Sequence, residues 1–477
     1  MHIPGKVRFI LDCLKENQYE GYAVGGCVRD SIMGRVPEDW DITTSAKPQE
    51  IKRIFPRTID TGIAHGTVTV MIDGEGFEVT TYRVDGKYED HRHPKEVLFT
   101  PNLEEDLKRR DFTINAMAFN PDSGIVDLFG GRKDIEHGCI RCVGNPVERF
   151  GEDALRMLRG VRFAGQLGFE IEEETLGAIR TCADTITNVS AERIRVELTK
   201  LLMSKHPEKL LQAEETGLCR FFLPEFPDMM RTEQNNPHHC YCVGEHSIEA
   251  VKNMQQVCRR FLDREKAESC LSPYNGVFSE EKVNTILLFA ALLHDVGKTV
   301  CRTTDADGVD HFYGHDAKGA EMAEVILKRF RFDNDTIRIV TGLIRFHERR
   351  HDGSCKTMRR LISKAGTEIM PYLFLLREAD VRSQSEYERE EKLALIEEGR
   401  QMYADISSAK EPVGIRDLAV TGNDLIGLGI RPGPKIGELL HILLELVIED
   451  PSKNERKLLL TEAQKHIKIK NECSCRS

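Results

Sequence analysis

The sequence predicts an α+β N-terminal region with a mixed sheet and helices, followed by regions that are helical throughout. Two runs rich in β-branched residues, 68–72 and 77–81, flank the turn sequence Asp-Gly-Glu-Gly, which indicates a β-hairpin. Between residues 152 and 167, apolar residues recur near helical spacing with arginines between them. The helical pattern continues to the end of the chain, with a break at residues 223–227.

These changes of pattern divide the chain into four expected regions. A head covers residues 1–140 and a helical neck covers 141–224. A second helical domain is expected over 225–385, and a helical tail over 386–477. The last 27 residues carry seven Lys/Arg against three Asp/Glu, a local basic excess.

Composition limits the class of protein. A length of 477 residues suggests about three domains, and 40% hydrophobic with 30% charged residues is ordinary for a globular protein. The longest apolar runs fall far short of the roughly 20 residues of a membrane span, so we expect a cytoplasmic protein without membrane contact. Fourteen cysteines are then expected to remain reduced. The net charge of −11 excludes binding of nucleic acid through bulk charge and leaves only a local basic surface.

The first chemical motif is Gly25-Gly26-Cys27-Val28-Arg29-Asp30, which follows a short apolar strand and opens an expected helix. The glycines allow close approach of the backbone, and free N–H groups of a first helical turn can bind phosphate. Arg29 could grip a triphosphate. By itself the motif also fits a tight strand–helix turn.

The second motif is Asp39-Trp40-Asp41. On a strand, Asp39 and Asp41 point to the same face, and two neighbouring carboxylates are tolerable where divalent cations lie between them. A solvated pair at a loop edge is the alternative. Trp40 is expected to pack into the core of the head.

Two arginine-rich motifs follow. Residues 108–116 join a basic cluster to an apolar segment, with Arg110 as a phosphate or ribose contact and Asp111 as a sugar-hydroxyl partner. Further on, Asp153, Arg156 and Arg159 recur every three residues, which places neighbours on one helix face, and an Asp–Arg pair can imitate the hydrogen-bonding edge of a base. The alternatives are a solvated charge run and a surface salt bridge.

In their order and spacing, these four motifs resemble the class II nucleotidyltransferases, the family of bacterial tRNA CCA-adding enzymes and poly(A) polymerases. The resemblance covers residues 20 to about 210. It implies that Asp39 and Asp41 are the catalytic carboxylates that hold Mg²⁺, and that the head is a nucleotidyltransferase domain. The nucleotide-binding residues that it implies are Gly26, Arg29, Arg110, Asp153, Arg156, Arg159 and Arg162.

Within this family, residues 61–68 resemble the tRNA-specific members, and residues 88–94 resemble the loop that members need to add the terminal adenosine. Residues 411–465 resemble the tRNA-contacting tail. The resemblance therefore implies a template-independent enzyme that adds CCA to tRNA from CTP and ATP and releases pyrophosphate. An A-adding tRNA enzyme or a poly(A) polymerase stays open as an alternative.

A second constellation lies in the region 225–385. An apolar helix ends in His294-Asp295-Val296-Gly297-Lys298, with His246 upstream and Asp380 downstream. His and Asp side chains from several helices can complete the shell of one cation. The set resembles the HD phosphohydrolase superfamily, which implies a divalent transition metal on His246, His294, Asp295 and Asp380. His315 and His347 would fit the further ligands of a two-metal version.

The HD resemblance implies hydrolysis of phosphomonoesters or 2′,3′-cyclic phosphates, and an HD fold without chemistry is its alternative. Readings of other classes are a chain that is mainly an HD phosphohydrolase and a non-catalytic RNA-binding protein. The intact carboxylates at Asp39 and Asp41, with Asp153 and Arg156, count against both.

Overall fold

The computed structural model describes residues 1–85, 97–264 and 277–474. The chain divides into two compact units, Met1–Pro227 and Asp228–Ser477.

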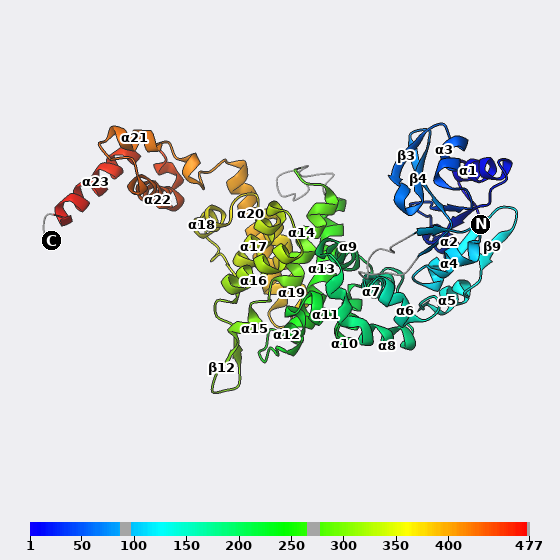
Figure 1. Ribbon diagram of the computed structural model, residues 1–477. Coiled ribbons are helices and arrows are strands. Elements are labelled where there is room, and N and C mark those ends of the chain that lie inside the picture. The colour runs from blue at the N-terminus through cyan, green and yellow to red at the C-terminus, as the bar shows by residue number, and fades with distance from the viewer. Residues whose placement is uncertain (86–96, 265–276, 475–477) are drawn as a thin grey trace. The chain divides into compact units, whose positions relative to one another are not determined.

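A seven-stranded mixed sheet forms the centre of the head in the first unit (Figure 1). Its strand order is β3-β4-β5-β2-β1-β8-β9. β2 and β5 pair in parallel, and the other neighbours are antiparallel, which confirms the predicted mixed sheet. The strands are β1 Gly21–Val24, β2 Ile42–Thr44, β3 Thr58–Gly62, β4 Thr67–Ile72, β5 Glu75–Thr81, β8 Met117–Asn120 and β9 Gly124–Asp127.

The predicted hairpin is the pair β4–β5. Its two connecting residues, Asp73 and Gly74, have φ values of 50° and 83°. A two-residue turn with both φ values positive matches the twist of the strands, and Asp-Gly is a favoured sequence for it. The other described pairs are short: β6 Arg83–Asp85 with β7 Val97–Phe99, and β10 Cys139–Ile140 with β11 Glu170–Ile171.

Helices bury the apolar face of the sheet. Ile10 and Leu14 of α1 join Ile51 of α3 and Val70 and Val79 of the sheet in one buried core cluster. The head helices are α1 Gly5–Glu16, α2 Gly26–Ile32, α3 Pro48–Ile54, α4 Leu103–Lys108 and α5 Gly131–His137. The helices that follow them are α6 Pro146–Glu152, α7 Leu155–Leu167, α8 Glu173–Cys182, α9 Ala191–Leu202, α10 Leu210–Glu215, α11 Cys219–Phe222 and α12 Glu225–Arg231.

The second unit is helical apart from the two-residue strands β12 Thr303–Thr304 and β13 Asp310–His311. Its helices are α13 Val243–Arg264, α14 Glu280–Leu293, α15 Lys298–Cys301, α16 His315–Arg329, α17 Asn334–Phe346, α18 Cys355–Ala365, α19 Met370–Ser383, α20 Arg389–Ser408, α21 Gly422–Gly427, α22 Pro434–Glu449 and α23 Arg456–Ser474. A separate apolar cluster, centred on Leu443 and Val447 of α22, supports the last helices.

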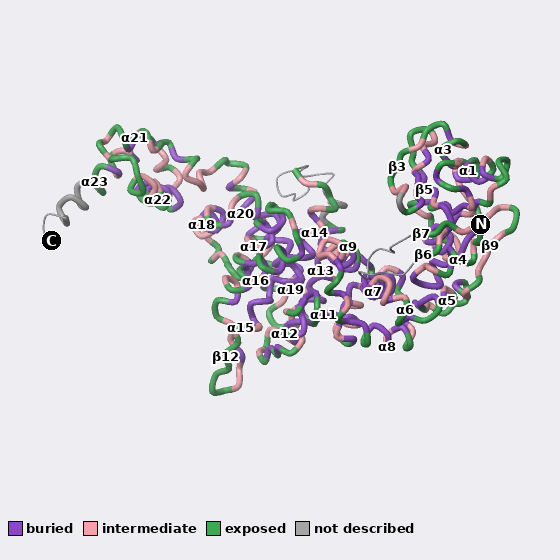
Figure 2. The backbone as a smooth tube through the Cα atoms, viewed as in Figure 1, coloured by how far each residue is buried: buried purple, intermediate pink, exposed green. Residues whose placement is uncertain are grey.

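α14 is the buried centre of this unit (Figure 2). The segment Glu280–Cys301 is long and apolar enough by length and composition to cross a membrane, but 78% of its apolar window is buried inside the unit. A core helix passes the same test, and α14 has the burial of a core helix on all sides rather than on one stripe.

Candidate active site and metal centre

The turn from β1 to α2 opens the candidate nucleotide site. Gly25 has φ 81°, a conformation that side chains other than glycine rarely adopt, and its N–H donates to the Met117 carbonyl at 3.1 Å. Gly26 and Arg29 line a cleft of about 780 Å³ within the first unit, together with Asp39 and Asp41. The cleft therefore brings the first two motifs together.

Asp39 and Asp41 precede β2 rather than lying within it. Exposure still alternates along this stretch: Trp40 is buried, and the carboxylates on either side are exposed. The N–H of Val24 donates to the Asp41 carbonyl at 2.9 Å, so the backbone here continues the sheet. Both carboxylates face the cleft because Trp40 anchors the opposite face in the core.

The surroundings of Asp41 favour a cation. Partial desolvation by the surrounding side chains raises the pKa of this solvent-accessible carboxyl, Glu78 and Asp39 raise it further, and Arg110 opposes them. Glu78 lies beside Asp41 because the neighbouring residues Val79 and Ile42 are paired between β5 and β2. Three carboxylates near one guanidinium form an oxygen donor set of the kind that Mg²⁺ prefers. Glu78 was missed from the sequence, since only strand pairing places it here.

A chain of polar contacts leads from the turn to the neck. Arg29 donates to Asn115 Oδ1 at 2.7 Å, and Asn115 donates to Asp111 Oδ1 at 3.3 Å. Asp111 in turn accepts from Arg159 at 2.6 and 2.8 Å. Burial would raise the pKa of Asp111, but Arg159 and Arg156 outweigh it and hold the pKa at about 2. Asp111 is therefore a charged link between Arg29 and α7.

Arg110 lies between the turn and α4. Its guanidinium is 3.4 Å from buried Asp106, and a Cβ added at Gly25 would lie 3.2 Å from Arg110 Nη1. Arg156 reaches the same segment, because it donates to the Arg109 carbonyl at 3.0 Å and to Glu152 at 2.5 Å.

The structure corrects the expected continuous helix over 152–167. α6 ends at Glu152, Asp153 is extended with φ −144° and ψ 103°, and α7 begins at Leu155. Asp153 caps the new helix by accepting from the Leu155 N–H at 3.1 Å. Its carboxylate pairs with Arg193 of α9 at 2.7 Å. Asp153 and Arg156 therefore lie on either side of a helix start, where Asp is a preferred N-terminal residue.

Arg162 lines the cleft from the other side. It pairs with buried Glu197 of α9, and its guanidinium lies 3.8 Å from the centroid of the Phe163 ring. Glu197 and Arg193 were not singled out in the sequence. Their only signal is their position on an amphipathic helix, which does not distinguish them from other charged residues.

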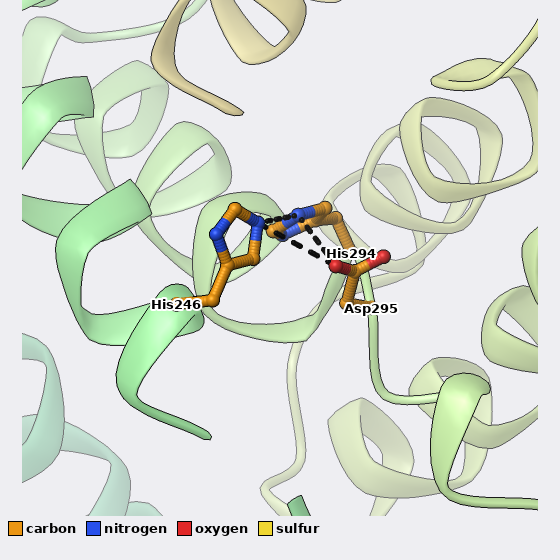
Figure 3. A group of neighbouring side chains, drawn as sticks. All are labelled: His246, His294 and Asp295. Atoms are coloured by element: carbon orange, nitrogen blue, oxygen red, sulfur yellow. Dashed lines mark hydrogen bonds and ion pairs between the residues drawn. The ribbon is translucent and has the colours of Figure 1, made fainter. Parts of the chain in front are cut away.

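The second constellation converges inside the second unit. His246 from α13 points toward His294 and Asp295, which follow α14 (Figure 3). His246 Nε2 lies 3.2 Å from His294 Nε2 and 3.5 Å from Asp295 Oδ2. Asp380 of α19 joins them, with Oδ1 3.0 Å from His246 Nε2. These four side chains are nearly or fully buried.

His315 and His347 form a second group around the same aspartate. Their Nε2 atoms lie 3.3 Å apart and 3.4 and 3.7 Å from Asp295 Oδ1. In each of the two groups, His246–His294–Asp295 and Asp295–His315–His347, the ligand atoms lie within 4.8 Å of one another, close enough to hold one metal ion. Asp295 belongs to both, with one oxygen toward each, as a carboxylate that bridges two cations would.

The imidazole tautomers fit a metal. The Nδ1 atoms of His294, His315 and His347 lie 2.6 to 2.8 Å from backbone carbonyls, so each Nδ1 carries a proton. The Nε2 atoms then face one another, an arrangement that needs a proton or a metal cation between them. Burial opposes protonation of His294, yet Asp295 and Asp380 raise its pKa to about 10. The carboxylates thus attract positive charge to the point where a metal would lie.

Lys298 is a neighbour of the site that the sequence did not single out as functional. Its Nζ lies 2.8 Å from Asp295 Oδ2 and also contacts Gln234 and His239, at 2.8 and 3.3 Å. A Cβ added at Gly297 would lie 2.2 Å from the His315 carbonyl, so this glycine allows the His-Asp turn to approach α16 closely. Residues 88–94, the expected loop for adenosine addition, lie outside the described residues.

Known protein families match successive and partly overlapping parts of this chain. Models of four families match: "Poly A polymerase head domain" at 21–141, "Probable RNA and SrmB- binding site of polymerase A" at 168–230, "HD domain" at 243–385 and tRNA nucleotidyltransferase domain 2 at 317–463. The head with its carboxylate-lined cleft and the histidine–aspartate centre define a nucleotidyltransferase that carries an HD domain.

The similar proteins identify the particular family. A CCA-adding enzyme of Pediococcus pentosaceus is 34% identical over 96% of this chain and 97% of its own length. One from Oceanobacillus iheyensis is 53% identical over 43% of this chain and 51% of its own length. The crystal structure of the Bacillus stearothermophilus CCA-adding enzyme in complex with CTP has a TM-score of 0.66 and 27% identity, covering 99% of this chain and 100% of that one. The chain belongs to the CCA-adding enzymes, which are tRNA nucleotidyltransferases.

Proposed function

We propose that this enzyme adds C, C and A to the 3′ end of tRNA from CTP and ATP, in the cleft of the first unit. The observation that carries the proposal is that Asp39, Asp41, Gly26 and Arg29 line one cleft. Solved CCA-adding enzymes of similar fold include one in complex with CTP, one from Thermotoga maritima complexed with tRNA and another in complex with ATP. The complete CCA reaction is therefore preferred over A addition alone and over polyadenylation.

In the proposed reaction, the tRNA 3′-hydroxyl attacks the α-phosphorus of the nucleotide, a new P–O bond forms, and the bond to pyrophosphate breaks. Mg²⁺ held by Asp39 and Asp41 would supply positive charge for the attacking and leaving oxygens. The backbone of Gly26 and the guanidiniums of Arg29 and Arg110 would hold the triphosphate, since helix N-termini and arginines favour phosphate oxygens.

Asp153 and Arg156 would select the base by hydrogen bonds, with Arg159 and Arg162 as further nucleotide contacts. In the structure, Asp153 pairs with Arg193, and Arg156 pairs with Glu152. Base recognition therefore requires these two side chains to exchange protein partners for the nucleotide. An incorrect base would leave their polar groups unpaired, which is the physical basis of selection.

The test is incorporation by the full-length enzyme into tRNA that lacks its last three nucleotides. We expect two cytidines with CTP alone and a complete CCA end with both nucleotides. Incorporation of A alone on tRNA ending in CC would favour an A-adding enzyme, and long A tails would favour a poly(A) polymerase. Asp41→Asn should abolish incorporation, while Asp60→Asn, a control on an exposed aspartate of β3, should not.

We also propose that the basic C-terminal tail contacts the tRNA and that the enzyme acts in the cytoplasm.

The second unit supports an added phosphohydrolase activity, which we propose for phosphate monoesters or 2′,3′-cyclic phosphates. The supporting observation is the shared Asp295 between two three-residue groups. A divalent transition metal bound there would act as a Lewis acid on the phosphoryl oxygens while water attacks phosphorus and the ester oxygen leaves. His246, His294, Asp295 and Asp380 would hold the first ion, with His315 and His347 at the second. Asp295→Asn should remove hydrolysis measured with Mn²⁺ and p-nitrophenyl phosphate and spare CCA addition.

A further inference from the structure

A small pocket opens beside the metal-binding group of the second unit. It has about 60 Å³ of space, where one water needs only roughly 10–15 Å³, so it has room for a group the size of a phosphate. His347 and Asp380 form its inner wall, and Phe374, Leu395 and Ile396 form an apolar side. The site described above does not use the remaining lining residues, which are mostly basic.

Lys392 of α20 is the most unusual of them, because it is a buried cation without a carboxylate partner. Only 6% of the residue is exposed. Its Nζ contacts neutral groups, His238 Nδ1 at 3.0 Å and Gln384 Oε1 at 2.9 Å. Among the residues that the structure describes, no carboxylate lies within ion-pair distance of it. Burial and Arg350 lower the pKa of Lys392, and the more distant carboxylates of Asp380, Glu388 and Glu348 only partly oppose this shift. A buried charge of this kind is costly unless an anion compensates it.

Arg377 and Arg350 add positive charge to the same pocket. Arg377 is 8% exposed and donates to the carbonyls of His347 and Phe346, both at 2.9 Å. Burial lowers the pKa of Arg377 to about 10. Arg350 lies exposed at the rim and has no carboxylate partner in the described part of the chain. The acidic lining residue Glu348 approaches His315 and His347, at 4.0 and 3.8 Å, and so belongs to the metal side.

Gln384 forms hydrogen bonds with both Lys392 and the metal-binding group. Its Nε2 donates to Asp380 Oδ1 at 3.1 Å, while its Oε1 accepts from Lys392. One amide therefore fixes the spacing between a metal-binding carboxylate and the buried ammonium group. A ligand between them would have the metals on one side and the ammonium on the other, which suits a phosphoryl group with oxygens pointing both ways.

We propose that this pocket binds the phosphoryl group of the hydrolytic substrate, and that Lys392 and Arg350 contact its oxygens. The inference rests on the proposed hydrolase function and adds the substrate class. The small volume beside the metal-binding side chains suits a phosphate ester whose phosphoryl group is terminal. The rest of the substrate lies outside the pocket, past Arg350.

The test uses full-length enzyme with Mn²⁺, p-nitrophenyl phosphate as the substrate, and a separate calorimetric titration with inorganic phosphate. Loss of one charge-assisted hydrogen bond should lower kcat/KM roughly 10- to 100-fold in Lys392→Met. Lys392→Arg should recover part of that loss because it restores the charge. Arg350→Gln should lower kcat/KM in the same direction, and Lys328→Gln, an exposed control on α16, should have no effect.

These measurements distinguish a failure of the pocket proposal from a failure of the proposed hydrolase function. Hydrolysis with unchanged kcat/KM in both Lys392→Met and Arg350→Gln would overturn the pocket and leave the hydrolase. Phosphate binding that depends on Lys392, without any hydrolysis, would overturn the hydrolase and support the pocket. The absence of both hydrolysis and phosphate binding would overturn the pocket with the hydrolase. If Lys392→Met does not fold, Arg350→Gln alone tests the pocket, since replacing the exposed side chain of Arg350 leaves the core intact.

Discussion

Replacing Glu378 with glutamine should destabilise the second unit and separate the two helices that build the pocket. Glu378 of α19 accepts from Arg400 of α20 at 2.7 Å, from Arg260 at 2.7 Å and from Arg382 at 2.9 Å. Burial would raise its pKa, but the three arginines outweigh burial and lower the pKa from 4.5 to about 2. In Glu378→Gln, an amide N–H would face guanidinium donors.

The size of the expected loss of stability follows from the shift in the pKa of Glu378. At about 1.4 kcal/mol per pKa unit, the charged form contributes roughly 3 kcal/mol to folding. Arg260 and Arg382 are 49% and 35% exposed, which screens their share, so about 2 kcal/mol is the expected loss. For a unit of this size, that corresponds to a fall in Tm of roughly 4–8 °C.

The pH dependence has a defined sign. Because the folded pKa is depressed, the stabilisation is fully present above the unfolded pKa of 4.5 and disappears as pH falls toward about 2. Calorimetry of the full-length protein should therefore show the same difference between wild type and Glu378→Gln at pH 7 and pH 5.5. The control is Glu397→Gln, which removes a 72% exposed partner of Arg400. A fall in Tm no larger than in the control, or one that vanishes by pH 5.5, would refute the reasoning.

Three further predictions concern the sites. Arg156→Gln should reduce discrimination between CTP and UTP by roughly 10-fold or more while Mg²⁺-dependent binding of pyrophosphate stays unchanged; equal discrimination in an incorporation assay would contradict its role. Asp111→Asn should weaken nucleotide addition and lower the Tm of the first unit, because half-buried Arg159 would lose its nearer carboxylate and keep only Glu197; unchanged kcat/KM would show that the polar chain from Arg29 does not matter. Gly297→Ala should reduce hydrolysis and Mn²⁺ affinity measured by calorimetry, since the added Cβ meets the backbone of α16, but CCA addition should persist.

The sequence predicted the mixed sheet of the head and the helical character of the rest because these depend on local patterns. The β4–β5 hairpin follows from alternating β-branched residues and an Asp-Gly turn, which short-range physics determines. The Asp39–Trp40–Asp41 alternation also followed from a local rule, although the pair precedes β2. What these residues bind remains a prediction for the experiments above.

Long-range pairing is what the sequence could not give. Glu78 meets Asp41 only because β2 and β5 are parallel neighbours, a crossover that no local pattern reveals. Asp153 illustrates a different limit. Its spacing to Arg156 fitted a helix face, but Asp also starts helices, and the contact with Arg193 of α9 stabilises the second arrangement. Helical spacing and the preference of Asp for helix starts thus predicted different structures, and the contact with Arg193 favours the helix start.

The histidine pair at 238 and 239 shows why residue type alone does not identify a metal ligand. His239 accepts from Lys298, which contacts Asp295, and His238 accepts from Lys392 beside Asp380. Burial and the neighbouring lysine lower the pKa of both rings, that of His239 to about 2. Each ring therefore stays a neutral acceptor that holds a cation from the protein itself, whereas His294 and His315 direct Nε2 at carboxylates, which raise the pKa of both rings. In a sequence the two kinds look alike, and only the direction of the ring nitrogen separates a lysine anchor from a metal ligand.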